Sequence, residues 1–182
     1  MNLYVIAGPA GSGKNLFGTL LKEELKKYSY KPCILHLTEP LYNYAKNHFD
    51  WDERSGEKPR EFLQKMGIEI IKEKLHKNYF LLDRLSEDIE ILSNFFDTFI
   101  ITDCRLIMEL TELKKRYDNV ITIHLIRLNY DNGLNIEEKN HITEIELEDY
   151  HNFDYEIENT SIENLKEIVH KIVKEQEVSK HE

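Results

Sequence analysis

Short apolar runs alternate along the chain with longer segments in which apolar residues recur at the spacing of a helix face. The short runs are rich in β-branched and aromatic residues, which is typical of buried strands. They lie at residues 3–7, 33–37, 99–103, 120–126 and 155–157. The segments with helical spacing lie at residues 13–28, 41–48, 59–76, 83–96, 106–117, 142–150 and 162–173.

Strands that alternate with helices predict a parallel sheet that is covered on both faces. We therefore expect an α/β protein of three layers, with a five-stranded parallel sheet flanked by helices. At 182 residues the chain has the length of one domain, which we expect to span residues 1–174. Segment 175–182 has little to bury, so we expect a flexible tail there.

The segment between the first strand and the first helix is rich in glycine and ends on Lys14. Glycines allow backbone N–H groups to turn inward around an anion, and the positive end of the following helix adds to the attraction. Lys14 can reach the outer phosphates as a point charge. The alternative is an accidental glycine-rich turn, but a complete match between a strand and a helix favours a phosphate-binding P-loop. The residues predicted to bind nucleotide here are Gly8, Ala10, Gly11, Ser12, Gly13 and Lys14.

One position departs from the P-loop pattern, because Asn15 stands where Ser or Thr usually follows the lysine. The usual hydroxyl holds Mg²⁺. An amide oxygen also ligates Mg²⁺, although more weakly, so we assign Asn15 as a weak metal ligand. The loop therefore predicts nucleotide binding more directly than catalysis.

Several polar groups directly follow predicted strands. They are residues 8–14, Glu39, Asp103, Arg105 and Arg127. Because ligands of open parallel sheets bind beyond the carboxyl ends of the strands, we expect these groups on one rim of the sheet. Asp103 ends its strand as an acidic Mg²⁺ or water ligand does in P-loop enzymes. A strand-end turn residue is the alternative for Asp103.

Further cations are available for a site that holds two phosphorylated ligands. Arg60 and Gln64 stand four residues apart on a predicted helix, so they share a face. The arginine can hold a phosphate while the amide reads a base edge, and the alternative is a solvated helix flank. Arg127 opens the polar segment 128–140, which we predict to be a mobile loop. It is either an arginine that closes on the transferring phosphate or a surface cation.

Net charge, apolar runs and cysteine content restrict the classes of partner and the cellular compartment that we expect. The net charge of −10 argues against a general nucleic-acid coat, which needs a basic face. No apolar run approaches the roughly 20 residues that span a membrane. The chain begins in a core strand without a charged leader, so we expect no signal peptide and a cytoplasmic protein. Strand rise places Cys33 and Cys104 about 15 Å apart, beyond disulfide reach, which fits a reducing compartment.

The positions of several histidines indicate structural residues rather than metal ligands. His36 and His124 fall inside predicted strands, where core histidines are more common than ligands. A second group, near one predicted helix, consists of His141, Glu144, Glu148 and His151. A metal site is disfavoured there, because no cysteine accompanies the group and acids crowd the segment. We expect the acidic region 136–158 to be a solvated face.

Several elements in order resemble the deoxynucleoside monophosphate kinases of phage and bacterial type, which are P-loop kinases. The family follows its P-loop lysine with Asp-Thr, where this chain has Asn15-Leu16. Its acidic-Pro-Leu-Lys element matches Glu39-Pro40-Leu41, with Tyr42 in place of the lysine. Its Arg-x-x-Leu-Gln-x-x-Gly element matches the segment from Arg60 to Gly67.

The second half of the chain continues the resemblance. The family's Asp-x-Arg element with a later Glu corresponds to Asp103, Arg105 and Glu109. A strand that ends in Arg corresponds to Arg127, and a His-x-Ser-Glu element corresponds to residues 141–144. The closing strand and turn of the family are matched by Asp154, Ile157 and Asn159.

The resemblance implies a P-loop kinase-type fold with an acceptor-binding region at about 39–80 and a lid at about 127–141. It implies transfer of the γ-phosphate of ATP to a nucleoside or deoxynucleoside monophosphate, with Mg²⁺. ATP would lie on residues 8–15, with the Asn159 turn near the adenine. Catalysis would involve Lys14, Asp103 and Arg127, with Asn15 and Asp103 on the metal. The acceptor would be held by Glu39, Arg60, Gln64 and Arg105.

Two alternatives stay open. One is a related P-loop kinase for another metabolite, of the phosphomevalonate or dephospho-CoA type. The other is a nucleotide-binding module without turnover, which the missing Ser or Thr favours and the retained arginines disfavour. The partners that we expect are small-molecule nucleotides, with no nucleic acid and no membrane. The sequence leaves a monomer and a homodimer open.

Overall fold

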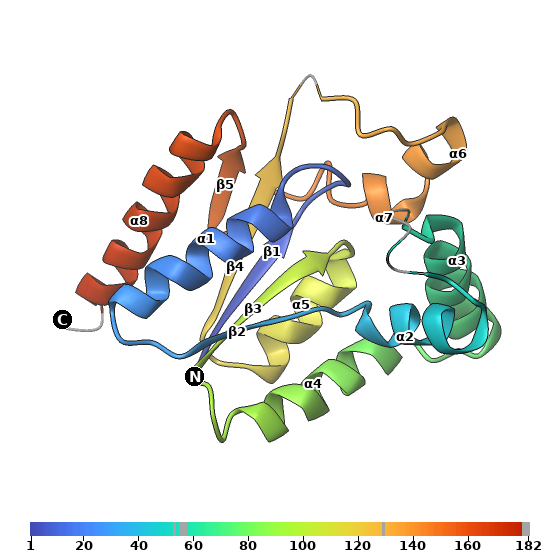
Figure 1. Cartoon of the computed structure of the whole chain (residues 1–182), viewed down its shortest axis with the longest axis horizontal. Coiled ribbons are helices and arrows are strands. Elements are labelled where there is room, and N and C mark those ends of the chain that lie inside the picture. The colour runs from blue at the N-terminus through green and yellow to red at the C-terminus, as the bar shows by residue number, and fades with distance from the viewer. Residues whose placement is uncertain (53, 55–57, 129, 180–182) are drawn as a thin grey trace. The chain divides into compact units, whose positions relative to one another are not determined.

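A five-stranded parallel sheet organises the larger part of the protein (Figure 1). The structure is a computed structural model that describes residues 1–52, 54, 58–128 and 130–179. It divides into one unit made of Met1–Leu35 with Leu92–Glu182 and a second unit made of His36–Ile91. Residues 53 and 55–57 of the predicted acceptor region, residue 129 of the predicted lid and residues 180–182 of the predicted tail lie outside the described residues.

The sheet of the first unit has the strand order β2-β3-β1-β4-β5. Its strands are β1 (Asn2–Ala7), β2 (Pro32–Leu35), β3 (Thr98–Cys104), β4 (Val120–Ile126) and β5 (Tyr155–Glu158). Central β1 pairs in parallel with β3 on one side and with β4 on the other. The predicted fold class is confirmed, and only β2 differs from its expected bounds by more than one residue, because it ends at Leu35 rather than at residue 37.

Two helices lie side by side against one face of this sheet, α1 (Lys14–Lys27) and α8 (Ile162–Ser179) (Figure 1). Phe17 and Leu21 of α1 and Leu165 and Val169 of α8 form one buried cluster with strand residues such as Ile6. Burying each such side chain contributes on the order of 1.5–3 kcal/mol. This packing holds α1 against the sheet.

Helix α5 (Ile107–Arg116) joins β3 to β4 and contacts β4. Its Leu110 and Leu113 are fully buried. Two shorter helices follow β4, α6 (Ile136–Lys139) and α7 (Ile142–Ile145). The predicted helix at 142–150 is therefore wrong in length, because α7 covers only its first turn and the chain then bends to bury Leu147. The polar segment 128–140 likewise contains α6 and a buried residue, Leu134.

The second unit is helical, with α2 (Glu39–His48), α3 (Arg60–Gln64), the π-helix η2 (Lys65–Lys74) and α4 (Phe80–Leu92, whose last residue is counted with the first unit). Ring contacts join Tyr42 to Trp51 and Phe49 to Phe62, with centroids 5.4 and 4.8 Å apart. The helix predicted at 59–76 is present as one helical run from Arg60 to Lys74, and it changes from an α-helix to the wider π-helix after Gln64. A Cβ on Gly67 would lie 3.2 Å from Leu41 Cδ1, so glycine lets α2 approach this helix.

The C-terminal helix is longer than predicted, because α8 continues to Ser179 instead of ending at residue 173. Two carboxylates of its last turns have partners on the sheet side. Tyr155 Oη donates to Glu175 Oε2 at 3.0 Å, and Tyr30 Oη donates to Glu177 Oε1. These contacts hold residues that sequence reasoning had assigned to the tail.

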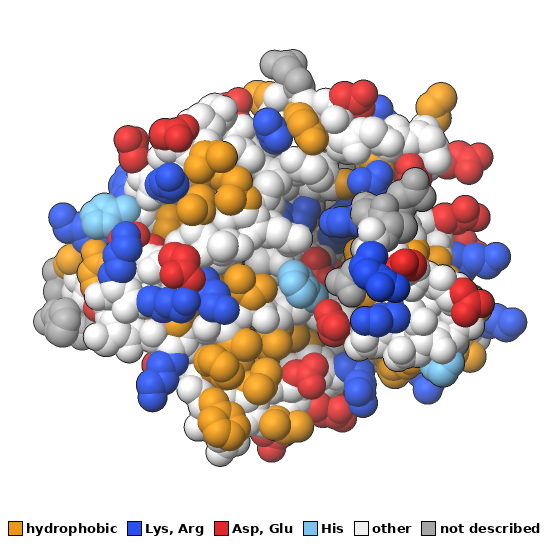
Figure 2. All heavy atoms as spheres, viewed as in Figure 1, with side chains coloured by type: hydrophobic (Ala, Val, Ile, Leu, Met, Phe, Trp, Pro, Cys, Tyr) orange, Lys and Arg blue, Asp and Glu red, His pale blue; other side chains and the backbone are white. Residues whose placement is uncertain are grey.

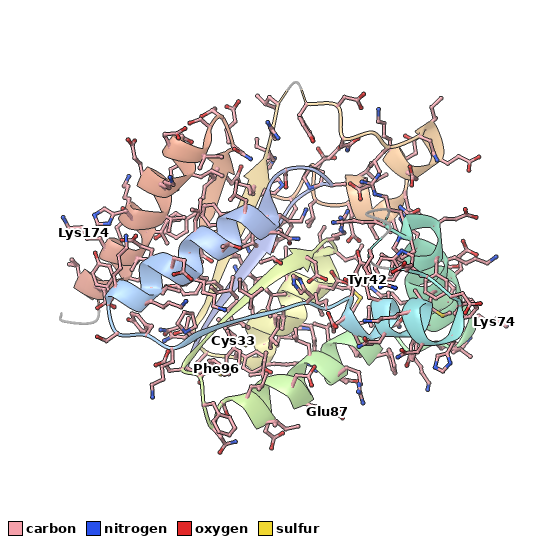
Figure 3. The ribbon with its side chains drawn as sticks, in the orientation of Figure 1. Cys33, Tyr42, Lys74, Glu87, Phe96 and Lys174 are labelled. Atoms are coloured by element: carbon pink, nitrogen blue, oxygen red, sulfur yellow. The ribbon has the colours of Figure 1, made fainter. Side chains whose placement is uncertain are left out.

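Both cysteines are free. Cys33 lies in β2 opposite Phe99 of β3 (Figure 3), whereas Cys104 ends β3. Burial raises the pKa of both thiols. The expectation that the two thiols do not pair is confirmed.

Acidic and basic side chains are interspersed over the face that Figure 2 shows. Among the described residues, no helix combines the length and the apolar character needed to cross a membrane.

The contact between α1 and α8 includes a carboxylate whose hydrogen bonds make stability depend on pH. Glu24 is nearly buried, and its Oε1 lies 2.8 Å from His170 Nδ1, while Lys27 Nζ donates to its Oε2 at 2.6 Å. These hydrogen bonds, first that from His170, lower the pKa of Glu24. Because the folded-state pKa is depressed, the stability it contributes is present above the unfolded-state pKa and is lost as the pH falls through the folded value.

We predict that Glu24→Gln lowers the free energy of unfolding at pH 7 by about 1 kcal/mol, the scale of the difference between a charged and a neutral hydrogen bond. Urea unfolding of the variant and the wild type measures this difference, which should shrink as the pH is lowered towards 4. Glu23→Gln is the matched control, because Glu23 forms its ion pair with Lys26 on the exposed side of the same helix. An equal loss in both variants would contradict the role of His170.

Candidate functional site

The glycine loop after β1 adopts, at several positions, a backbone that side chains other than glycine rarely accept. Gly8, Gly11 and Gly13 have φ angles of 140°, 78° and 102°. A Cβ on Gly8 would lie 2.2 Å from the Leu125 carbonyl oxygen, and one on Gly13 would lie 2.5 Å from Asn159 Nδ2. The backbone of the loop therefore packs closely against β4 and against the turn after β5.

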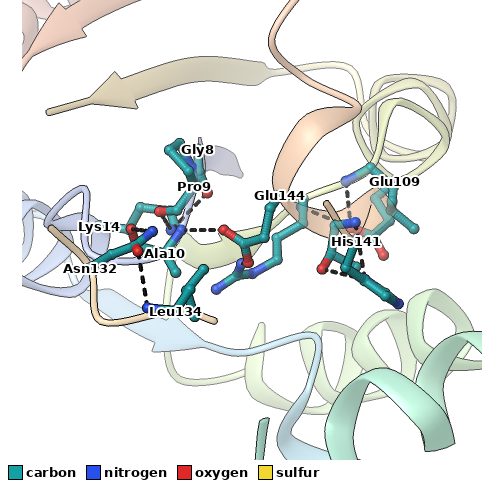
Figure 4. A network of polar contacts seen from close by, with 12 residues as sticks. Gly8, Pro9, Ala10, Lys14, Glu109, Asn132, Leu134, His141 and Glu144 are labelled. Carbon is teal, nitrogen blue, oxygen red and sulfur yellow. Dashed lines mark hydrogen bonds and ion pairs between the residues drawn. The ribbon is translucent and has the colours of Figure 1, made fainter. Parts of the chain in front are cut away.

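Lys14 is the first residue of α1 and is only 7% exposed. Its Nζ donates to the carbonyl oxygens of Gly8 at 2.8 Å and Pro9 at 2.6 Å (Figure 4). The ammonium group is thus held over the loop. A phosphate in the loop would offer it stronger, charged acceptors than these two carbonyls.

Ser12 supplies a further polar atom within the loop. The residue is 1% exposed, and its hydroxyl oxygen has no hydrogen-bond partner among the described residues. A buried polar atom without a partner costs about 1–3 kcal/mol. Such an atom in a glycine loop fits a site that is completed by a ligand with hydrogen-bonding oxygens.

Asn159 ties the turn after β5 to the loop. Its Nδ2 donates to the Ser12 carbonyl at 2.9 Å, and its backbone N–H donates to the Ile126 carbonyl at 2.7 Å. The predicted nucleotide-binding residue Asn159 therefore lies beside the phosphate loop itself. Its place near an adenine stays a prediction.

Asn15 is connected to β3. Thr102 Oγ1 donates to Asn15 Oδ1 at 3.0 Å, and Thr102 is 1% exposed. The next residue on β3 is Asp103, which is half-buried. An amide oxygen has two lone pairs, so this hydrogen bond leaves one for a cation. The oxygen groups of Asn15, Thr102 and Asp103 suit the ligand preference of Mg²⁺.

Arg105 follows β3 and is fixed by Glu109 of α5. Glu109 Oε2 accepts hydrogen bonds from the backbone N–H groups of Arg105 at 3.0 Å and Leu106 at 3.1 Å. This carboxylate caps α5, which is favourable because the helix N-terminus is positive. The cap directs the chain so that Arg105 emerges next to the phosphate loop.

Glu144 joins the loop to Arg105, and Figure 4 shows its contact with Ala10. Its Oε2 accepts from the backbone N–H of Ala10 at 2.7 Å, and its Oε1 pairs with Arg105 Nη1. The Glu144 side chain is 7% exposed. The expectation of a solvated acidic face is therefore wrong for this residue, and its match to the His-x-Ser-Glu element was the signal that could have singled it out.

The chain after β4 also lies against the loop. Asn132 Nδ2 donates to the Ala10 carbonyl at 3.3 Å. The Arg127 guanidinium lies over the Tyr130 ring, 4.0 Å from its centre, a contact that an exposed arginine makes favourably. The predicted lid segment thus contacts the predicted phosphate loop, and the catalytic role of Arg127 stays a prediction.

The histidines were predicted to be structural. His124 lies in β4, stacks on Phe153 with ring centres 4.6 Å apart, and is 8% exposed. Burial is the main cause that lowers the pKa of His124. His36 lies after β2 rather than inside it. Among the described residues, no group of three His, Cys, Asp or Glu side chains is arranged to hold a metal.

Three predicted substrate residues belong to the second unit. Glu39 begins α2 and is exposed. Arg60 and Gln64 begin and end α3, one helical turn apart as predicted, and both are half-buried. That these side chains share a ligand with the phosphate loop stays a prediction.

Comparison with known proteins places the fold. No model of a known protein family matches the chain, and no curated protein matches its sequence. Solved structures do match over nearly the whole length. The APS kinase of Mycobacterium tuberculosis, in complex with AMPPNP and APS, has 11% sequence identity and a TM-score of 0.57, covering 97% of both chains.

Two further structures agree. The shikimate kinase of Aquifex aeolicus has 17% identity and a TM-score of 0.54, covering 98% of both chains. A sugar kinase of Janibacter sp. has 11% identity and a TM-score of 0.56, covering 96% of this chain and 95% of its own. The protein therefore has the fold of these P-loop kinases of small molecules.

Proposed function

We propose that this protein is a kinase that transfers the γ-phosphate of ATP to a nucleoside or deoxynucleoside monophosphate. One observation carries the proposal, which is the strained glycine loop with Lys14 held over it at the end of a buried strand. The fold shared with small-molecule kinases supports phosphotransfer. The assignment of a nucleoside monophosphate as the acceptor rests on the spacing of Arg60 and Gln64 and on the resemblance to the deoxynucleoside monophosphate kinases.

The protein's part in this reaction is positioning and charge stabilisation, because phosphoryl transfer asks little covalent chemistry of a protein. The N–H groups of the loop and Lys14 would hold the ATP phosphates. Lys14 would exchange its carbonyl acceptors for phosphate oxygens. Arg105, and Arg127 from the segment after β4, would neutralise charge that develops on the transferring group.

The residues that would hold Mg²⁺ are Asp103 and, more weakly, Asn15. When bound, the ion neutralises charge on the phosphates. Thr102 keeps the Asn15 amide oriented through its hydrogen bond to Oδ1. The two residues thereby present their oxygens from the start of α1 and from the end of β3.

A kinase for a different phosphorylated metabolite is the second candidate. The similar structures act, by their names, on APS, shikimate and a sugar. A coupled assay of ADP release, run over nucleoside monophosphates and these three acceptor classes, distinguishes the candidates. Turnover with a nucleoside monophosphate, and with none of the other three acceptor classes, supports the proposal. ATP binding without turnover on any acceptor indicates a binding module.

We predict that Lys14→Ala lowers turnover about a hundredfold or more, because a charge that stabilises the transferring phosphate is lost. The coupled assay measures turnover, and circular dichroism checks that the variant is folded. Lys26→Ala, at an exposed position of the same helix, serves as the control and should keep normal turnover. A folded Lys14→Ala protein with normal turnover would refute the P-loop assignment.

For the metal, we predict that Asp103→Asn raises the Mg²⁺ concentration needed for half-maximal activity, since a charged ligand is replaced by a neutral one. Asn15→Ser should keep or lower this concentration, because it restores the usual hydroxyl. Titration of activity with Mg²⁺ at saturating ATP gives both values. Unchanged Mg²⁺ dependence in Asp103→Asn would show that this carboxylate is not the ligand.

For the acceptor, we predict that Arg60→Ala weakens its binding by about 2–4 kcal/mol while ATP affinity stays the same, because one charged partner of the phosphate is lost. Gln64→Ala should mainly reduce discrimination among bases. Acceptor KM and kcat for several monophosphates, beside ATP titrations, test both. Lys65→Ala is the control on the adjoining turn, and equal damage to ATP and acceptor binding by Arg60→Ala would contradict the assignment.

A further inference from the structure

A nearly buried carboxylate lies in a loop that is built to bind anions. Glu144 Oε2 accepts from the Ala10 N–H at 2.7 Å, and the side chain is 7% exposed. A carboxylate so far from water needs charged or hydrogen-bonding partners. Among the described residues, the partners of this side chain are the Ala10 N–H and the guanidinium of Arg105.

These two partners are groups that a phosphate would also use. The Ala10 N–H belongs to the glycine loop, and Arg105 is the cation at the end of the neighbouring strand. A carboxylate oxygen and a phosphate oxygen make the same kind of charged hydrogen bond to an N–H group. Both ligands therefore compete for one position.

The segment that carries Glu144 is held by a second carboxylate of the same kind. Glu146 Oε2 accepts from the backbone N–H of Ile107 at 2.8 Å, at the start of α5. The partner of the Glu146 carboxylate is the N-terminus of α5 and not the glycine loop. Glu144 can leave Ala10 while Glu146 keeps the segment attached to α5.

We infer that Glu144 is a built-in competitor for the nucleotide, occupying the position of a phosphate oxygen until ATP displaces it. This inference rests on the proposed function, since it requires that the loop binds phosphate. Displacement would also free Arg105 from its ion pair, so that the arginine becomes available for phosphate only when ATP is bound. ATP binding and the readiness of the acceptor site are then coupled through one side chain.

The test is calorimetric titration of ATP and of adenosine into the wild type, Glu144→Gln, Glu146→Gln and Lys14→Ala. Glu144→Gln removes the competing charge but keeps the shape and one acceptor oxygen. We expect it to bind ATP about tenfold more tightly, the effect of removing one charged hydrogen bond that must otherwise be broken. Adenosine, which has no phosphate, should show no change, and Glu146→Gln should bind ATP as the wild type does.

The outcomes separate this inference from the proposed function. If the wild type does not bind ATP, or if Lys14→Ala binds it equally well, the proposed function fails and the inference fails with it. If Lys14→Ala loses binding but Glu144→Gln binds ATP as the wild type does or more weakly, only the role of Glu144 is overturned. An equal gain in Glu146→Gln would overturn it too, since the effect would then come from loosening the segment.

A second measurement needs no variant. A crystal structure of the wild-type protein with a non-hydrolysable ATP analogue should show the Glu144 carboxylate away from the Ala10 N–H, with a phosphate oxygen in its place. A carboxylate that still accepts from Ala10 beside the bound triphosphate would overturn the inference.

Discussion

The backbone polar groups of the glycine loop, residues 8–14, must find partners at the end of a strand that is buried after its first residue, and several elements of the first unit supply them. A buried N–H or C=O without a partner costs about 1–3 kcal/mol. Side chains from four parts of the chain meet this need, namely Lys14, Asn132, Glu144 and Asn159. They come from α1, from the segment after β4, from α7 and from the turn after β5. The loop thus joins elements that are far apart in sequence.

The backbone of the loop is closely packed against its neighbours. At Gly8 and Gly13 a side chain would collide with Leu125 and with Asn159. The loop therefore lies close to its surroundings at these two positions. Within the described residues, the carboxylate that reaches it is that of Glu144, carried by a segment whose acidic composition alone would place it in water.

The sheet could be predicted from sequence because short apolar runs and helical periodicity are local signals, and four strands lie within one residue of their expected bounds. The phosphate loop was equally local, since its motif is contiguous. Glu144 could not be predicted in the same way, because its burial depends on Ala10 and Arg105, which are distant in sequence. The change to a π-helix after Gln64 and the short length of α7 were not predicted, since the apolar spacing there is also that of a longer α-helix. Tyr30 and Tyr155 likewise hold the end of α8, where composition alone suggested a tail.

Asn15 departs from the P-loop pattern, and the structure shows which group stands beside it. The usual hydroxyl after the lysine is replaced by the Asn15 amide, but a hydroxyl still stands beside it, because Thr102 Oγ1 from β3 lies 3.0 Å from Asn15 Oδ1. A methyl-bearing residue fits there only because Gly18 leaves room, since a Cβ on Gly18 would lie 2.4 Å from Thr102 Cγ2. Asn15, Gly18 and Thr102 therefore form one arrangement that brings oxygen groups of α1 and β3 together. The loss of the motif's own hydroxyl does not by itself indicate a site that has lost its chemistry.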